Sequence, residues 1–256
     1  MIKSFISLTC GSISGTDSFA EILTHLKRNL TTVLEEIVKL PSESDERVTL
    51  FGPLLGRSVL ELSFTCIIGR LDPFRLLTLR EFQMQASSSG GDSLGSRSAS
   101  AFQWNGDVKP SEKEPEKLWE GDRSMSKVAR SLLGNTYGDI FWKPAFNETL
   151  DAITDTHSGP WITEIQGIEP DSFVVRTRTD CDRTYSTLSK GIHYEFIIPP
   201  GAIYDKTSVI VFVKDAIRLA SRLALLSHAT STCQGKLALA DALQSFTTAQ
   251  QFESLA

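Results

Sequence analysis

The sequence predicts a mainly α-helical protein in which residues 1–256 form a single helical bundle. Apolar residues recur at three- and four-residue steps in several long segments, as on the buried face of a helix. Capping residues and prolines stand where those segments begin. Hydrophobic residues make up 41% of the 256-residue chain, which is enough for a substantial core. We also expect a flexible Ser/Gly-rich insertion at about 86–115. Near 173–200, a short β element is an alternative to a helix.

The first long helix is predicted at 17–40, because one apolar stripe runs along it. Ser18 and Glu21 fit a capping box at its start. The stripe consists of Phe19, Ile22, Leu23, Leu26, Leu30, Val33, Leu34 and Ile37. We therefore expect this helix to pack one face against the core.

The second and third helices are predicted from prolines. Pro53 is typical of a first helical position, and the segment from Pro53 to Leu71 is apolar on most sides, as expected for a central helix. Asp72 before Pro73 reads as an N-cap, so a third helix should run from Pro73 to about Gln85.

The segment at about 86–115 is rich in Ser and Gly and contains few apolar residues, so it buries too little surface to offset the entropy of ordering. Helices are expected again at 115–133 and 144–153. Between 154 and 184 the pattern is ambiguous, and 173–175 (Phe-Val-Val) fits a short strand. Asp205 can cap a helix from Thr207, and a last helix is expected at 235–252.

Composition restricts the function. The net charge of −5 and the pI near 5.5 argue against a protein that binds nucleic acid over its whole surface. Any RNA site should therefore be a local basic patch. No phosphate loop or dinucleotide fingerprint is present, and we predict no cofactor and no metal. The four cysteines, at 10, 66, 181 and 233, are scattered and are expected to be reduced structural thiols.

The location of the protein is predicted from its apolar segments. The N-terminal run is too short and too interrupted by serine for a signal peptide, and the apolar window 54–79 contains several charged residues. We therefore expect a cytoplasmic protein that does not enter the membrane.

A first candidate site lies at 182–195. If this segment is helical, Tyr185, Ser189 and His193 form a polar row, and Asp182 returns to the same side. A histidine of near-neutral pKa can accept a proton from a ribose 2′-hydroxyl, while Arg183, together with the arginines at 176 and 178, can contact phosphate. This chemistry suits metal-free RNA cleavage. The alternative is that His193 only hydrogen-bonds the turn that follows the helix.

A second candidate pair is Arg222 and His228, which are separated by five residues. Residues six apart on a regular helix point about 120° away from each other, so the pair does not form a compact site by itself. The alternative is a histidine at a helix end, stabilised by the helix dipole.

These motifs resemble HEPN-type helical proteins of bacterial defence and toxin systems. The resemblance rests on Tyr-x-x-Leu-Ser-x-x-Ile-His at 185–193 and on Arg222-x5-His228. It implies a metal-independent ribonuclease site across a homodimer, with Arg222 and His228 as catalytic residues. The sequence departs from the family at Leu223, where a polar residue is usual. The alternative function is a non-catalytic helical subunit that docks a partner protein or a second copy.

Overall fold

The computed structural model describes residues 1–12, 15–88, 104–109, 131–193, 198–199 and 201–255, with only the backbone for 82–88. Within these residues there are helices and no strand of a sheet, so the mainly α prediction is confirmed. The α-helices are α1 Ile2–Cys10, α2 Ser18–Lys39, α3 Asp45–Leu71, α4 Pro73–Ser88, α6 Asn135–Tyr137, α7 Lys143–Ala152, α8 Pro160–Gln166, α9 Phe173–Ile192, α10 Lys206–Ala229 and α11 Leu239–Ala249. Short turns of 3-10 or π helix are η1 Leu40–Ser42, η2 Gly138–Trp142, η3 Pro170–Ser172 and η4 Gln250–Ser254.

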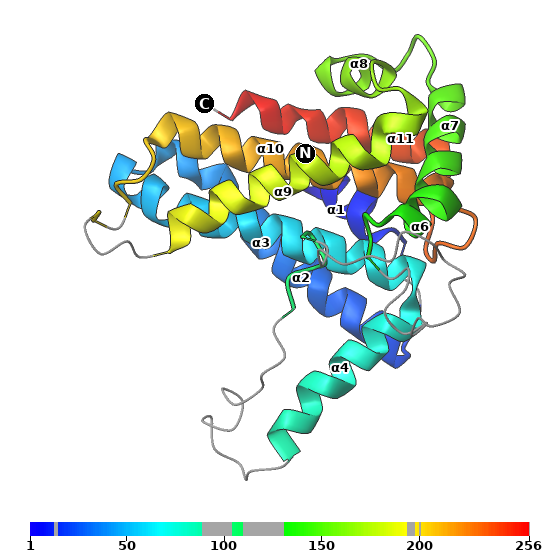
Figure 1. The fold of residues 1–256 in the computed structure, drawn as a ribbon, viewed down its shortest axis with the longest axis horizontal. Coiled ribbons are helices and arrows are strands. Elements are labelled where there is room, and N and C mark those ends of the chain that lie inside the picture. Colours follow the sequence, from blue (N-terminus) through cyan, green and yellow to red (C-terminus); the bar gives the residue numbers. More distant parts are fainter. Residues whose placement is uncertain (13–14, 89–103, 110–130, 194–197, 200, 256) are drawn as a thin grey trace.

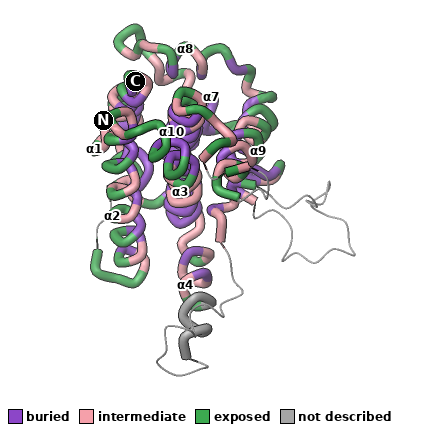
Figure 2. Tube along the Cα trace, turned by 90° about the vertical axis from the view of Figure 1, so that its left-hand side faces the viewer, coloured by how far each residue is buried: buried purple, intermediate pink, exposed green. Residues whose placement is uncertain are grey.

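The centre of the bundle is the pair α3 and α10, which pack against each other more extensively than any other two elements described (Figure 1). Helices α2 and α9 cover α3 from two sides, while α1 and α11 pack together and against α10. Both central helices are largely buried, and α4 projects from the body (Figure 2). One hydrophobic core cluster runs from Phe5 to Leu255.

Two glycines of α3 allow its neighbours to approach closely. A Cβ atom on Gly52 would collide with the side chain of Val209 on α10, and one on Gly56 would lie 2.9 Å from Leu188 on α9. Larger residues at these positions would push the helices apart. The contact of α3 with both neighbours therefore depends on these glycines.

In the first half of the chain, two helix starts differ from the prediction. Asp17, rather than the expected Ser18 and Glu21 box, caps α2, and its side chain accepts a hydrogen bond from the Ala20 N–H. Helix α3 starts at Asp45 with Ser44 as N-cap, so Pro53 lies inside the helix and does not open it. The acidic residues after Ser44 favour the helix N-terminus electrostatically, which explains the earlier start.

Most other helices agree with the sequence prediction. Asp72 accepts a hydrogen bond from the Arg75 N–H at the start of α4, and Asp205 caps α10 through the Ser208 N–H. The alternative of a strand at 173–175 is wrong, because 173–192 is the helix α9, with Phe173 the first in a row of buried residues at helical spacing. The final helix begins at Leu239 and not at 235, since Gly235 has a positive φ of 61°.

The predicted insertion is only partly described. Residues 86–88 continue α4, while 89–103 and 110–115, and most of the helix expected at 115–133, lie outside the described residues. Within the predicted insertion, the short segment 104–109 packs onto the body: Val108 is fully buried, and the Asp107 carboxylate accepts hydrogen bonds from the Leu132 N–H and from Arg75.

Candidate functional site

The predicted polar row on α9 does not converge on His193. Tyr185 is buried against α3, and its hydroxyl donates to the Glu61 carboxylate at 2.8 Å. Burial, and then this hydrogen bond, raise the pKa of Tyr185 to about 12. The guanidinium of Arg57 lies 4.8 Å from the centre of the Tyr185 ring and also pairs with Glu61. Tyr185 thus joins α9 to α3.

The other members of that row point to different surroundings. His193 is exposed at the C-terminal end of α9, where its backbone N–H donates to the Ser189 carbonyl. The Ser189 hydroxyl is buried and has no hydrogen-bond partner among the described residues. Asp182 lies 3.1 Å from Lys109 and Arg183 lies 3.1 Å from Asp180, so neither orients the histidine.

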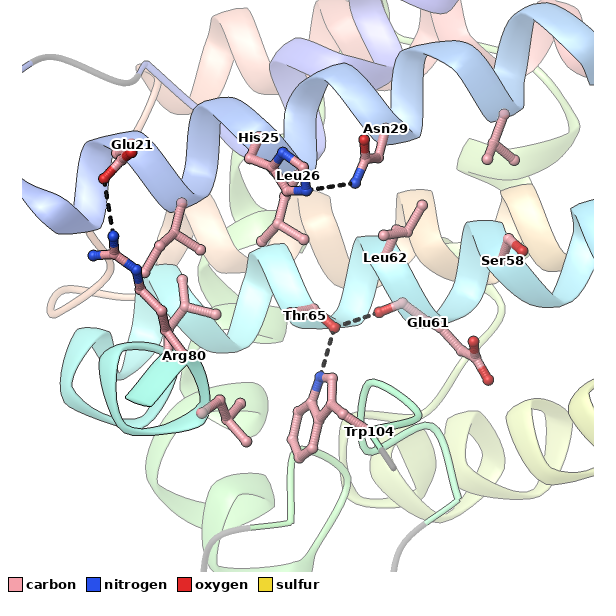
Figure 3. A pocket seen from close by; sticks show the side chains of 14 residues that line it. Glu21, His25, Leu26, Asn29, Ser58, Glu61, Leu62, Thr65, Arg80 and Trp104 are labelled. Atoms are coloured by element: carbon pink, nitrogen blue, oxygen red, sulfur yellow. Dashed lines mark hydrogen bonds and ion pairs between the residues drawn. The ribbon is translucent and has the colours of Figure 1, made fainter. Parts of the chain in front are cut away.

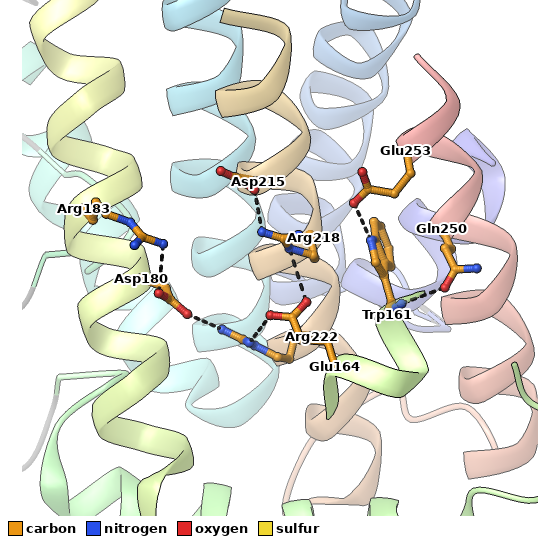
Figure 4. A network of polar contacts seen from close by, with 9 residues as sticks. All are labelled: Trp161, Glu164, Asp180, Arg183, Asp215, Arg218, Arg222, Gln250 and Glu253. Carbon is orange, nitrogen blue, oxygen red and sulfur yellow. Dashed lines mark hydrogen bonds and ion pairs between the residues drawn. The ribbon is translucent and has the colours of Figure 1, made fainter. Parts of the chain in front are cut away.

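Arg222 belongs to an ion-pair network of α8, α9 and α10 (Figure 4). It is 2% exposed and lies 3.2 Å from Glu164 and 3.5 Å from Asp180. Arg218 also contacts Glu164, at 3.4 Å, and Arg183 contacts Asp180. Arginines and carboxylates therefore alternate in this network. The Arg222 guanidinium, which the resemblance assigned to RNA cleavage, is engaged in these ion pairs.

His228 lies in a separate buried cluster. It is 3% exposed, its Nδ1 accepts from the Leu237 N–H at 2.9 Å, and its Nε2 lies 2.8 Å from the Leu8 carbonyl. These partners place the proton on Nε2, which donates to Leu8. Burial, and then the neighbouring charge of Arg70, lower the pKa of His228 to about 3, so the ring is neutral at pH 7.

Arg70 is the centre of this cluster and was not singled out by sequence reasoning. It lies on α3 and is fully buried. Its guanidinium donates to the Leu8 and Thr9 carbonyls of α1, the Gln234 carbonyl, the Ser227 hydroxyl and Nδ1 of His228. The only signal was an arginine within the most apolar window of the chain. Such a residue must find internal partners when the helix is buried.

The predicted catalytic residues therefore occupy three places. Arg222 and His228 both lie on α10, but they point in different directions and contact separate sets of partners, as their spacing of six residues requires. His193 is accessible, whereas His228 is enclosed. The catalytic roles of these residues, and those of Arg183, Ser189 and Tyr185, stay predictions. Of the two predicted catalytic histidines, only His193 is exposed to solvent.

A groove of about 570 Å³ lies between α2, α3 and α4 (Figure 3). Its apolar wall includes Ile22 and Leu26 of α2, Leu62 of α3, Leu79 of α4 and the ring of Trp104. Concave sites of this size with apolar walls and a few polar groups are typical binding sites.

Trp104 has a defined orientation in this groove. Its indole N–H donates to the Thr65 hydroxyl at 2.8 Å, and that hydroxyl donates to the Glu61 carbonyl at 2.6 Å. Arg75 lies 5.1 Å from the ring centre. Sequence reasoning missed Trp104 because it lies in the predicted insertion, although an aromatic residue just before Asn105-Gly106 was a signal for a packed turn.

No protein-family model, curated protein or solved structure matches this chain. The function must therefore be argued from the groove and the polar clusters themselves.

The described part of the chain also bears on metal and membrane binding. It contains no group of three or more His, Cys, Asp or Glu side chains that could hold a metal ion. One described helix, α3, is long and apolar enough to cross a membrane, and 61% of its most apolar window is buried inside the bundle. The core helix of a soluble protein meets the same criterion. The predictions of no cofactor, no membrane and a cytoplasmic location are not tested by these observations.

Proposed function

We propose that this chain is a non-catalytic interaction subunit that binds an amphipathic helix of a partner protein in the groove between α2, α3 and α4. The proposal rests on the apolar wall of this groove. Part of that wall is the ring of Trp104, which its hydrogen bond to Thr65 holds in one orientation. Aromatic side chains in such positions are common anchors of protein interfaces.

The dimensions of the groove suit a helix. Helix α2 lines it from Glu21 to Val33, a rise of about 18 Å at 1.5 Å per residue. Three turns of a bound helix have the same length and would present apolar side chains at i, i+3 or i+4, and i+7. The length of this wall favours a helix over a compact small molecule.

The polar groups around the groove suit the flanks of such a helix. Arg80 and Glu21 form an ion pair of 3.3 Å at one end, where they can hydrogen-bond polar side chains of the partner (Figure 3). His25 and Asn29 on α2, 3.0 Å apart, and Ser58 on α3 add further polar groups. Because both charge signs are present, we expect a partner helix with an apolar stripe and mixed charges beside it.

Photo-crosslinking in cells tests the proposal. A photoreactive amino acid at Val33, in the groove, should capture a segment with apolar residues at helical spacing, whereas the same group at Glu35, outside the groove lining, should not. A synthetic peptide of that segment should then bind the purified chain, as measured by fluorescence anisotropy.

A matched pair of variants makes the test specific. Val33→Asp should weaken peptide binding at least tenfold, because it places a charge in the apolar groove. Val211→Asp, the same change at an exposed valine of α10, should leave binding unchanged. Equal crosslinking from positions 33 and 35, a captured segment without an apolar stripe, or equal binding by the two variants would reject the groove as the docking site.

A second candidate, from the HEPN resemblance, is a metal-independent ribonuclease or toxin component that acts as a homodimer on RNA. The observation that favours it is the exposure of His193. Cleavage should then persist in EDTA, leave a 2′,3′-cyclic phosphate and disappear in His193→Ala. Cleavage that needs a divalent metal, or that is unchanged in this variant, contradicts the hypothesis, and sedimentation tests the dimer.

A further inference from the structure

Arg70 is a buried positive charge that pairs with no carboxylate among the described residues. All the described hydrogen-bond acceptors of the fully buried Arg70 are neutral: three backbone carbonyls, one hydroxyl and the neutral ring of His228. A buried arginine usually pairs with a carboxylate, because an isolated charge in a low-dielectric interior is costly. A negative group of another kind beside Arg70 would lower that cost.

Two cysteines lie in this region. Cys10 is the last residue of α1, directly after Leu8 and Thr9, whose carbonyls accept from Arg70. Cys66 lies on α3, one helical turn before Arg70. The two Sγ atoms are 3.7 Å apart, although 56 residues separate them in sequence. A disulfide bond of about 2.05 Å would need the sulfurs to approach by about 1.7 Å.

Cys10 is 1% exposed and borders a cavity. A cavity of about 220 Å³ is lined by Cys10, by Ala20 and Leu23 of α2, and by Gln234 and Gly235 of the loop after α10. A water molecule occupies about 30 Å³ of liquid, so the cavity can admit hydrogen peroxide. Cys66 is fully buried behind Cys10 and does not line this cavity.

The end of α1 is built closely around this site. Gly11 has a positive φ of 65°, and a Cβ atom there would collide with the Gly235 carbonyl and lie 2.9 Å from Nε of Arg70. The Ser12 N–H donates to the same carbonyl at 2.8 Å. The chain directly after Cys10 is therefore held closely against Arg70 and the loop after α10.

We propose that Cys10 and Cys66 form a peroxide-reactive dithiol, in which Cys10 is oxidised first and Cys66 closes a disulfide with it. The Cys10 thiolate attacks one oxygen of hydrogen peroxide, which yields a sulfenic acid and releases hydroxide. The Cys66 sulfur then attacks the sulfenic sulfur and expels its oxygen as water. The proton that Cys10 lost on ionisation neutralises the hydroxide, so two thiols and one peroxide give one disulfide and two waters.

The electrostatics of the pair support this order. The hydrogen bond between Cys10 and Cys66 lowers the pKa of Cys10, and the charge of Arg70 lowers it further, against the effect of burial. The same hydrogen bond, together with burial, raises the pKa of Cys66 well above its usual value. Cys181 on α9 provides a contrast, since burial raises its pKa to about 12. Cys10 is thus the nucleophile and Cys66 the resolving thiol.

The test uses the full-length reduced protein, treated with a small excess of hydrogen peroxide while circular dichroism verifies that it stays folded. Free thiols are then alkylated under denaturing conditions and mapped by mass spectrometry. We expect a peptide linked through Cys10 and Cys66, with Cys181 at least ten times less oxidised. Recovery of both Cys10 and Cys66 as free thiols when other cysteines have reacted, or linkage through a different pair, would overturn the proposal.

Two variants identify the roles of the sulfurs. Cys66→Ala should stop the reaction at a sulfenic acid on Cys10, which dimedone traps, and Cys181→Ala should behave like the parent protein. A dimedone adduct that forms first at another cysteine contradicts the assignment. Should Cys66→Ala fail to fold, the linkage map of the unsubstituted protein still decides the proposal. This inference is independent of the groove and of ribonuclease activity.

Discussion

Two buried arginines on the central helices are held in different ways. Arg70 of α3 and Arg222 of α10 are 0% and 2% exposed. Arg222 pairs with two carboxylates, those of Glu164 and Asp180, which are themselves partly exposed. Arg70 donates only to neutral groups among the described residues. Equal burial therefore does not imply equal surroundings.

The difference shows how position determines the way in which a charge is accommodated. Arg222 lies at the edge of the bundle, where water still solvates its partners and where Arg218 and Arg183 can share the carboxylates. Arg70 lies where α1, α3 and the loop after α10 meet, and it donates hydrogen bonds to backbone carbonyls of α1 and of that loop. The first arginine is one member of a network, whereas the second joins segments distant in sequence.

The largest effect is expected for Arg70→Met. The substitution removes the donors from Arg70 to the Thr9 and Gln234 carbonyls, one of the two donors to the Leu8 carbonyl, and a bond to His228. Breaking such a set should lower the free energy of unfolding by about 3–5 kcal/mol. Urea denaturation of the variant and the parent measures this loss. A loss under about 1 kcal/mol would mean that the cluster around Arg70 is not what joins α1 to the bundle.

A smaller effect is expected from pH. His228 has a pKa of about 3 in the folded protein against 6.5 when unfolded, so between these values the unfolded state binds the extra proton and stability falls as pH falls. From pH 6.5 to 5 the loss should be about 1.6 kcal/mol, because the slope grows from half of about 1.4 kcal/mol per unit at pH 6.5 to nearly that full value at pH 5. Arg70 and Lys236, the charges nearest to His228, are both cationic and oppose its protonation.

The control for this pH dependence is His228→Asn, which has no titrating ring. The variant is less stable overall, but the part of the slope between pH 6.5 and 5 that belongs to His228 should be absent. His193→Ala, at an exposed position, should keep the full slope. Urea denaturation at several pH values compares the three proteins, and an unchanged slope in His228→Asn would show that the folded histidine titrates normally.

The helices could be predicted largely from sequence because their signals are local. The apolar stripe of 17–40, the caps Asp72 and Asp205 and the broad apolar face of α10 all depend on residues within a few turns. The start of α9 at Phe173 could not be recognised, because 173–175 is β-branched and aromatic, and burial against α7 decides its conformation.

The buried clusters could not be predicted, because their partners lie far apart in sequence. Leu8, Arg70 and His228 are joined only after three helices have packed, and nothing in their local sequence indicates this. The groove depends in the same way on the return of Trp104 to Thr65 of α3. Spacing drew attention to His228 and Arg222, but burial gives each of them structural partners.

The smallest effect is expected for Arg222→Met, which sharpens the comparison with Arg70→Met. Glu164 keeps Arg218, Asp180 keeps Arg183, and both carboxylates can also be solvated. Methionine fills much of the volume of the arginine side chain and needs no partner, so the loss should be about 1 kcal/mol. Added salt screens partly exposed ion pairs, so the difference from the parent should shrink between 0.05 and about 0.5 M salt, roughly the range over which screening becomes strong. The Arg70→Met loss should depend little on salt, because its partners are neutral. If Arg222→Met is as damaging as Arg70→Met, the ion pairs of Arg222 are more strongly coupled than their exposure indicates, and the contrast between the two arginines fails.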